Sequence, residues 1–358
     1  MTISIALAAG GTGGHLLPAL AVADAVRAKV PDARMVLIGS HRHLDAALAE
    51  KVGMEVVATD VISFGSLAQI PKVALRLRRA VREAKSELSQ REVSAVLGFG
   101  GYPSLPAVLA AGRIGAQALV HEANALPKLG LANGIAARMG ARVFGGWPTT
   151  GSRIGSKPKI VGVPLRADIS ELDLVTARRT AHEALGLEPS GKPVILIVGG
   201  SLGARRINDA AIEAIQRASD RFRFILSTGV DDHQRVADAL GEAARVYPFI
   251  DDMATAYAAC DVVVARAGAV TVAEIATLGL PAVLVPLPVA RADEQTLNAE
   301  QLVARGQATI VEDRRLDGES LIGAAEQRLA AGPVEPDRTH SSAAATLADA
   351  LLQGVTLA

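Results

Sequence analysis

The sequence predicts an α/β protein with two Rossmann-like, doubly wound parallel-sheet domains that face each other across a cleft. Three observations support this prediction. A short apolar run, a glycine-rich turn and a helix-like stretch occupy residues 3–26, and residues 194–215 repeat the plan. Elsewhere, short apolar runs alternate with alanine-rich amphipathic stretches, as in parallel sheets buried on both faces. The chain has 358 residues, 50% of them hydrophobic, which is enough for two such cores.

Each repeated unit places a glycine turn between a buried strand and a helix start, so that backbone N–H groups and the helix dipole can face an anion. The first has a strand at 3–9, a turn at 10–14 and a helix at 16–26; the second has them at 194–198, 199–203 and 204–215. Further strands are expected at 35–38, 95–97, 118–120, 225–226, 262–264 and 282–285.

The chain is expected to divide in the stretch 145–164, which is rich in Gly, Pro, Ser and Thr. A helical stretch at 172–185 then leads into the second repeated unit. A second weak point at 332–340 precedes a last alanine-rich helix, 341–352. The residues alone leave open which domain that helix packs on.

Composition restricts the class of protein. The single cysteine, Cys260, is interpreted as a buried core residue, and the lack of disulfides or Cys/His clusters favours a reducing cytosol. No signal peptide is expected at the first residues, and no membrane-spanning helix is expected because no window reaches about 18 uninterrupted apolar residues. The net charge is zero, but residues 1–165 carry a net charge of +9 and residues 166–358 carry −9. The two halves are therefore expected to bind different partners.

The glycine loops do not match the common nucleotide-binding motifs. Counted from Gly11, the pattern G-x-G-x-x-G would need glycine at Leu16, so a nicotinamide-dependent dehydrogenase is not expected. The segment 186–192 is similar to a P-loop, but Pro193 replaces the required Ser or Thr. No Asp-x-Asp occurs, so we expect no metal and no other cofactor. Backbone amides and an arginine would then neutralise a bound diphosphate.

Polar residues follow several predicted strands of the first half. His15 comes directly after the first glycine turn, at the carboxyl edge of a parallel sheet, where ligands bind in such folds. A lone histidine is often structural, but its near-neutral pKa suits His15 to removing a proton from an alcohol. The turn at 98–104 and the stretch 121–124 follow the next strands and indicate a second ligand at this edge, although the turn alone could be only a tight loop.

The second half has its own polar cluster. Residues 247–253 follow a strand, and 265–274 form another strand–glycine–helix transition. Glu274 lies in the first turns of that helix, where its carboxylate could accept from a ribose diol or only stabilise the helix dipole. Gln295 and Asn298 follow the next loop.

A basic amphipathic helix is expected at 67–88, with Leu75 projecting among its charges. A solvated surface helix would show the same pattern. The alternative is attachment to an anionic membrane surface, to which each Lys or Arg contributes about 1 kcal/mol. The basic residues are Lys72, Arg76, Arg78, Arg79 and Arg82.

In their order and spacing, these motifs resemble the MurG family of bacterial N-acetylglucosaminyltransferases, which make lipid II from lipid I. The resemblance runs through nearly the whole chain and implies the glycosyltransferase-B fold, with a last helix that returns to the N-terminal domain. It implies an acceptor-side and membrane-side domain of 1–164 with 341–358, and a UDP-sugar domain of 165–340. The segments that carry it are 10–15 with Pro18, 98–102, 121–124, 162–166, 199–205, 247–253, 268–274 and 279–281.

The resemblance implies transfer of N-acetylglucosamine from UDP-N-acetylglucosamine to the 4-hydroxyl of the muramoyl sugar of lipid I, with inversion and with His15 as base. The implied donor-binding residues are Thr12, Gly13, Gly14, Asn124, Arg166, Ser201, Ile250, Ala269, Val270, Thr271, Val272, Ala273, Glu274 and Gln295. Among these, Ile250 would read uracil through its backbone and Glu274 would bind the ribose. The implied acceptor-binding residues are Gly100, Gly101 and Tyr102, and the implied membrane patch is Lys72, Leu75, Arg76 and Arg79.

The resemblance also implies a peripheral protein on the cytoplasmic face of the plasma membrane. Its expected partners are UDP-N-acetylglucosamine, lipid I, the anionic membrane surface and proteins of cell-wall synthesis or division, without nucleic acid. The sequence departs from the family at Ala123, at Ala265 and Ala267, and in 289–294, which bears on substrate preference. The alternatives are a diacylglycerol glycosyltransferase, a UDP-N-acetylglucosamine 2-epimerase and a catalytically silent nucleotide-sugar-binding scaffold.

Overall fold

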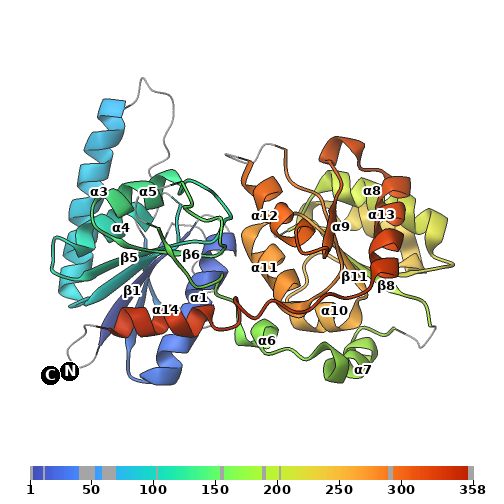
Figure 1. The fold of residues 1–358 in the computed structure, drawn as a ribbon, viewed down its shortest axis with the longest axis horizontal. Coiled ribbons are helices and arrows are strands. Elements are labelled where there is room, and N and C mark those ends of the chain that lie inside the picture. Colours follow the sequence, from blue (N-terminus) through green and yellow to red (C-terminus); the bar gives the residue numbers. More distant parts are fainter. Residues whose placement is uncertain are drawn as a thin grey trace. The chain divides into compact units, whose positions relative to one another are not determined.

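The computed structural model describes residues 3–10, 13–39, 53–58, 70–101, 104–153, 157–187, 191–200, 203–288 and 293–353. The chain forms two compact units, 1–166 with 339–358 and 167–338 (Figure 1). The boundaries expected from the sequence, 164/165 and 340/341, each lie two residues from these divisions. Each unit is a parallel sheet with helices on both faces, so the predicted fold class is confirmed.

In the described residues, the sheet of unit 1 has seven parallel strands in the order β3-β2-β1-β4-β5-β6-β7. This is the doubly wound order, in which the chain reverses direction next to β1. The strands are β1 (Ser4–Ala8), β2 (Arg34–Gly39), β3 (Glu55–Ala58), β4 (Ala95–Gly98), β5 (Gln117–Glu122), β6 (Arg142–Gly145) and β7 (Lys159–Ile160).

Apolar side chains cover both faces of this sheet. Ile5 and Leu7 of β1 face a core shared with two helices, while Ala6 and Ala8 face a second core on the other side. The first core is closed by α1 (Gly13–Lys29) and α14 (Ala343–Leu352), the second by α3 (Ile70–Gln90), α4 (Ser104–Ala111) and α5 (Leu131–Arg138). The last helix therefore packs on unit 1, where Leu347 and Leu351 are fully buried.

In its described residues, unit 2 has a parallel sheet in the order β10-β9-β8-β11-β12-β13. The strands are β8 (Val194–Val198), β9 (Arg223–Ser227), β10 (Arg245–Tyr247), β11 (Val262–Ala265), β12 (Ala282–Leu284) and β13 (Ala308–Ile310). The helices are α6 (Ala167–Ser170), α7 (Leu174–Ala184), α8 (Arg205–Ala218), α9 (His233–Leu240), α10 (Met253–Ala259), α11 (Ala269–Leu278), α12 (Glu294–Val303) and α13 (Gly318–Ala331). The short 3-10 helices are η2 (Val230–Asp232), η3 (Gly241–Ala243) and η5 (Asp313–Arg315).

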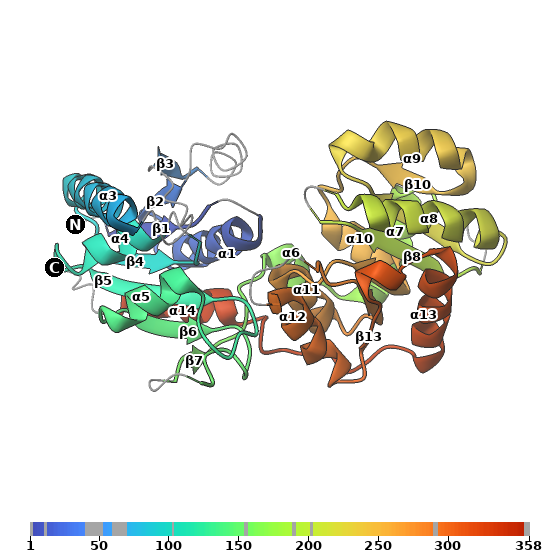
Figure 2. The same ribbon diagram turned by 90° about the horizontal axis from the view of Figure 1, so that it is seen from above.

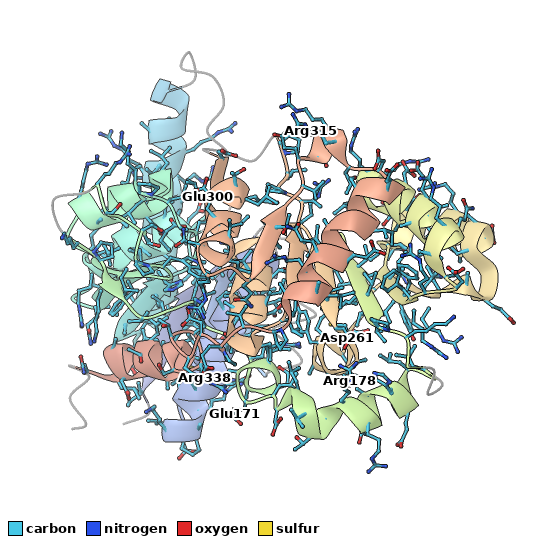
Figure 3. All side chains as sticks on the ribbon, turned by 45° about the vertical axis from the view of Figure 1, so that its right-hand side comes forward. Glu171, Arg178, Asp261, Glu300, Arg315 and Arg338 are labelled. Carbon is cyan, nitrogen blue, oxygen red and sulfur yellow. The ribbon has the colours of Figure 1, made fainter. Side chains whose placement is uncertain are left out.

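The core beneath one face of this sheet is formed with α8, α9 and α13 (Figure 2). At the amino ends of the strands, Arg178 of α7 pairs with Asp261 at 2.7 Å between Nη2 and Oδ1 (Figure 3). The other oxygen of Asp261 accepts from Val194 N at 2.7 Å, which fixes α7 to the start of β8. Cys260 is buried beside this pair, as predicted.

Two histidines of unit 1 hold together the segments where the chain leaves this unit and returns to it. Nε2 of His121, at the end of β5, lies 2.8 Å from Gly162 O, and Val163 N donates to Nδ1 of His340 at 2.9 Å. A Cβ at Gly162, whose φ is +91°, would lie 2.5 Å from Thr339 O. Only glycine permits this approach of the outgoing and returning chain.

Replacing His121 with Gln should reduce the pH dependence of stability. Burial lowers the pKa of His121 to about 4, whereas an unfolded histidine titrates near 6.5. Between these values the unfolded chain binds the extra proton, so the unfolding free energy falls as the pH drops, by about 3 kcal/mol in total. Urea denaturation at about pH 7 and pH 4.5 measures the unfolding free energy of both proteins. Between these two pH values, the unfolding free energy should decrease less in His121→Gln than in the wild type. Equal decreases in both proteins would contradict the assignment.

Candidate active site

His15 lies in the first turn of α1, where the chain leaves the carboxyl end of β1. Its ring packs against the backbone turn after β4: a Cβ would lie 3.3 Å from His15 Cδ2 if added at Gly101, and 3.6 Å from Cε1 if added at Gly100. Both glycines have positive φ, +87° at Gly100 and +72° at Gly101. The structure thus brings together two of the predicted acceptor-binding residues and the predicted base.

The surroundings of His15 favour its neutral form. Burial lowers its pKa below the usual 6.5, and this effect outweighs the charge of Glu122 and a backbone hydrogen bond with Phe99, which both raise it. The side chain is half-buried, so it keeps some access to a ligand. A neutral imidazole at pH 7 can accept a proton, as a general base must.

Glu122, at the end of β5, organises the polar loop beside His15. Its Oε1 accepts from Asn124 N at 3.3 Å and from Asn124 Nδ2 at 3.1 Å, and its Oε2 accepts from Gly130 N at 3.2 Å and Asn133 Nδ2 at 3.0 Å. Glu122 as a residue is only 6% exposed, so these hydrogen bonds replace the lost hydration of its carboxylate. The predicted sugar contact Asn124 is therefore held by a buried carboxylate.

Glu122 lies within the predicted polar stretch 121–124, but no role was predicted for its side chain. A signal for it was present, because Glu122 is the only acidic residue between Glu92 and Asp168, a stretch with eight Lys and Arg. A single acidic residue in a basic segment is a candidate for a buried carboxylate that accepts hydrogen bonds from neighbouring loops.

Thr12, Tyr102 and Ser201 lie outside the described residues, as does the side chain of Lys72. Gly13 and Gly14 form the start of α1. Arg166 is half-buried at the end of unit 1, immediately before α6.

In unit 2, α8 and α11 begin at the carboxyl edge of the sheet, and neither has a side-chain hydrogen bond at its N-cap within the part of the chain that the structure describes. α11 starts at Ala269 after Gly268, and α8 starts at Arg205 after Ala204. Val272 N already bonds to Gly268 O at 2.9 Å, so the N–H groups of Ala269, Val270 and Thr271 are those of the open first turn. Such helix starts bind anions through N–H groups and the helix dipole.

Glu274 lies in the second turn of α11 and is 9% exposed. Its Oε2 accepts a hydrogen bond from the Tyr257 hydroxyl at 2.8 Å. Ile250, the predicted uracil contact, is half-buried in the loop between β10 and α10. Tyr257 was not singled out as a functional residue from the sequence.

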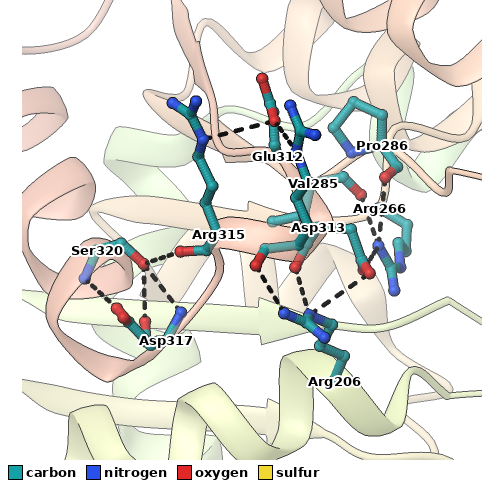
Figure 4. Close-up of polar contacts among 10 residues, drawn as sticks. Arg206, Arg266, Val285, Pro286, Glu312, Asp313, Arg315, Asp317 and Ser320 are labelled. Carbon is teal, nitrogen blue, oxygen red and sulfur yellow. Dashed lines mark hydrogen bonds and ion pairs between the residues drawn. The ribbon is translucent and has the colours of Figure 1, made fainter.

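The loops at this edge are braced by Arg266, which directly follows β11 (Figure 4). Its Nη1 donates to Val285 O at 3.1 Å and Pro286 O at 3.4 Å, and it pairs with Asp313 Oδ1 at 2.6 Å. Arg206 of α8 also pairs with Asp313, at 3.5 Å. The connections after β11, β12 and β13 are thereby fixed to one another and to the start of α8.

Two side chains of α12 form further hydrogen bonds to the backbone of these loops. Oε1 of Gln295 accepts from Leu287 N at 3.0 Å, and Nδ2 of Asn298 donates to Ala267 O at 3.2 Å. Gln295 was predicted to contact sugar hydroxyls. Because the side-chain oxygen of Gln295 already accepts from Leu287 N, the side-chain nitrogen is the group suited to a contact with sugar hydroxyls.

The exposed part of α3 contains the predicted patch residues. Leu75 is 66% exposed, Arg76 is exposed beside it, and Arg79 pairs with Glu83 at 2.8 Å. Further along, Val81, Ala84 and Leu88 are buried in the core, so α3 projects beyond the rest of unit 1 at its N-terminal end (Figure 1).

Among the described helices, none is both long and apolar enough to cross a membrane. Nor do the described residues contain a group of three or more His, Cys, Asp or Glu that could hold a metal.

Two family models match the chain. The glycosyltransferase family 28 N-terminal domain matches residues 5–144, and the C-terminal domain of the same family matches residues 194–351. The crystal structure of Acinetobacter baumannii MurG superposes with a TM-score of 0.75 at 27% identity, covering 99% of this chain and 100% of that one. A UDP-GlcNAc 2-epimerase from Neisseria meningitidis, at 15% identity and a TM-score of 0.65, shares the fold.

Curated relatives align over most of their length. One from Paenarthrobacter aurescens is 39% identical over 330 residues, which are 89% of this chain and 86% of the relative. One from Rhodococcus erythropolis is 38% identical over 326 residues, 88% of this chain and 83% of the relative. Both are named UDP-N-acetylglucosamine--N-acetylmuramyl-(pentapeptide) pyrophosphoryl-undecaprenol N-acetylglucosamine transferase. The chain therefore belongs to glycosyltransferase family 28 and, within it, to the MurG family of N-acetylglucosamine transferases.

Proposed function

We propose that the protein transfers N-acetylglucosamine from UDP-N-acetylglucosamine to N-acetylmuramyl-pentapeptide pyrophosphoryl-undecaprenol, which is lipid I, and so forms lipid II for peptidoglycan. The relatives that match nearly 90% of the chain carry this activity in their names. The structural observation that carries the proposal is the position of His15, whose ring packs against the Gly100–Gly101 turn at the carboxyl edge of unit 1 and whose pKa is lowered by burial.

The proposed mechanism is a single displacement. The 4-hydroxyl of the muramoyl sugar attacks the anomeric carbon from the face opposite UDP, the bond to the diphosphate breaks, and the configuration inverts. His15 takes the hydroxyl proton, a role that typically contributes about 10²–10⁴-fold. Asn124, oriented by Glu122, would bind the transferred sugar.

The donor would bind unit 2. The open starts of α8 and α11 support a diphosphate site built from backbone N–H groups, which stabilise the charge that develops on the leaving UDP. Arg166 would add a positive charge, and no metal is required in this proposal. Glu274 would bind the ribose and the backbone at Ile250 the uracil.

We further propose that the protein is peripheral at the cytoplasmic face of the membrane that carries its acceptor. The exposed Leu75 and its basic neighbours on α3 support this, because an apolar side chain and several cations suit an anionic headgroup layer. Proteins of cell-wall synthesis and division are the proposed partners at this surface.

Transfer of radiolabelled sugar from UDP-N-acetylglucosamine to a short-chain lipid I analogue is the direct test. We expect labelled lipid, with a diacylglycerol acceptor left unlabelled. UDP release without labelled lipid I analogue would contradict the proposed acceptor and favour an epimerase or another glycosyltransferase. UDP binding without turnover would favour a silent scaffold.

Replacing His15 with Gln should lower kcat/KM by about 10²–10⁴-fold while UDP binding is kept. In the wild type, kcat/KM should decrease as the pH is lowered, with an apparent pKa below 6.5, because burial lowers the pKa of His15 and only the neutral form accepts a proton. His233→Gln, on α9, is the matched control. It should keep the wild-type kcat/KM and the same decrease at low pH. Near-normal turnover of His15→Gln would show that another group is the base.

Reversing charge on α3 should weaken membrane attachment. The double variant Arg76→Glu, Arg79→Glu should bind vesicles containing phosphatidylglycerol at least about tenfold more weakly, since each cation contributes about 1 kcal/mol. Sedimentation with phosphatidylcholine vesicles, with and without phosphatidylglycerol, measures this, and Arg217→Glu on α8 is the control. Unchanged binding would favour the solvated-helix alternative.

A further inference from the structure

Tyr257 is a completely buried residue in unit 2 with a polar group directed at the candidate donor site. It lies in α10, has no exposed surface, and donates its hydroxyl hydrogen to Oε2 of Glu274 on α11 at 2.8 Å. A buried tyrosine hydroxyl needs an acceptor, and here the acceptor is a carboxylate rather than a backbone carbonyl. Hydrogen bonds to charged acceptors are shorter and stronger than neutral ones, so this contact restrains both partners.

The helix that carries Tyr257 begins at the loop proposed to read the base. Asp252 caps α10, accepting from Thr255 N at 2.9 Å and from the Thr255 hydroxyl at 2.6 Å. Ile250 lies two residues before this cap. α10 is therefore a rigid connection between the loop that contains Ile250 and the carboxylate of Glu274.

A glutamate side chain has three rotatable bonds, and its carboxylate can turn away from a ligand. Holding it in one orientation before the ligand arrives reduces the entropy that binding must overcome. The hydrogen bond from Tyr257 restrains Oε2 of Glu274 and so limits the orientations that the carboxylate can adopt. The direct contact with a ligand remains that of Glu274.

We propose that Tyr257 is a positioning residue for the donor, which orients Glu274 for recognition of the ribose hydroxyls. This inference rests on the proposed function, in which Glu274 binds the ribose of a uridine diphosphate sugar. Tyr257 itself touches no reacting atom. Its contribution should therefore appear in donor binding and should depend on the ribose hydroxyls.

Tyr257→Phe deletes only the hydroxyl and retains the ring that packs in the core. KM for UDP-N-acetylglucosamine should rise about tenfold and kcat should change by less than about twofold, because the lost bond acts on ground-state and transition-state binding alike. In calorimetry, the variant should bind UDP about tenfold more weakly but bind 2′,3′-dideoxy-UDP nearly as well as the wild type does. In a Glu274→Gln background, Tyr257→Phe should not change the ratio of the two affinities further.

Thr277→Val is the matched control. It also removes a buried hydroxyl from this region, on α11 itself, but that hydroxyl donates to Ala273 O at 2.8 Å and not to Glu274. Its UDP to dideoxy-UDP ratio should equal that of the wild type. Equal weakening of both nucleotides by Tyr257→Phe, no weakening, or failure of that variant to fold would each overturn the positioning role. A wild type that binds no UDP, or does not distinguish the two nucleotides, would instead contradict the proposed function.

Discussion

The parallel sheet is the constraint on which the rest of the structure depends. The central strands of the two sheets, β1, β4, β8 and β11, are buried along their whole length and hydrogen-bonded to neighbours on both sides, so irregular backbone and helix starts occur at the strand ends. Because the strands are parallel, the carboxyl ends of all of them meet at one edge. In unit 1 this edge collects His15, the Gly100–Gly101 turn and Glu122, and in unit 2 it collects the starts of α8 and α11.

Buried polar contacts then fix the orientation of the groups at these edges. Glu122 holds Asn124 in unit 1, while Tyr257 holds Glu274 and Arg266 holds three loops in unit 2. Burying these charges costs solvation, and paired hydrogen bonds offset that cost only when the geometry is good. The same contacts leave the proposed ligand-binding groups with little freedom, which is what a site that must stabilise a transition state requires.

The fold class could be predicted from the sequence because its signals are local. Short apolar runs, glycine turns and alanine-rich stretches predict the central strands, and the position of His15 after the first turn follows from them. The short strands β3, β6, β7 and β13 were not predicted. The bracing contacts could not be predicted, because they join residues far apart in the chain. His121 meets Gly162 across 41 positions, and Arg206 meets Asp313 across 107. The burial of Val81, Ala84 and Leu88 of α3 and the hydrogen bond to the side-chain oxygen of Gln295 likewise depend on packing that no local pattern encodes.

In the proposed donor site, backbone N–H groups at the starts of α8 and α11 neutralise the diphosphate without a metal ion. The decisive measurement is calorimetric binding of UDP-N-acetylglucosamine to the full chain, first in EDTA and then with excess Mg²⁺. We expect the same affinity under both conditions, and weaker binding at high salt because the contact is electrostatic. Binding that is lost in EDTA and restored by Mg²⁺ would show instead that a metal ion neutralises the diphosphate.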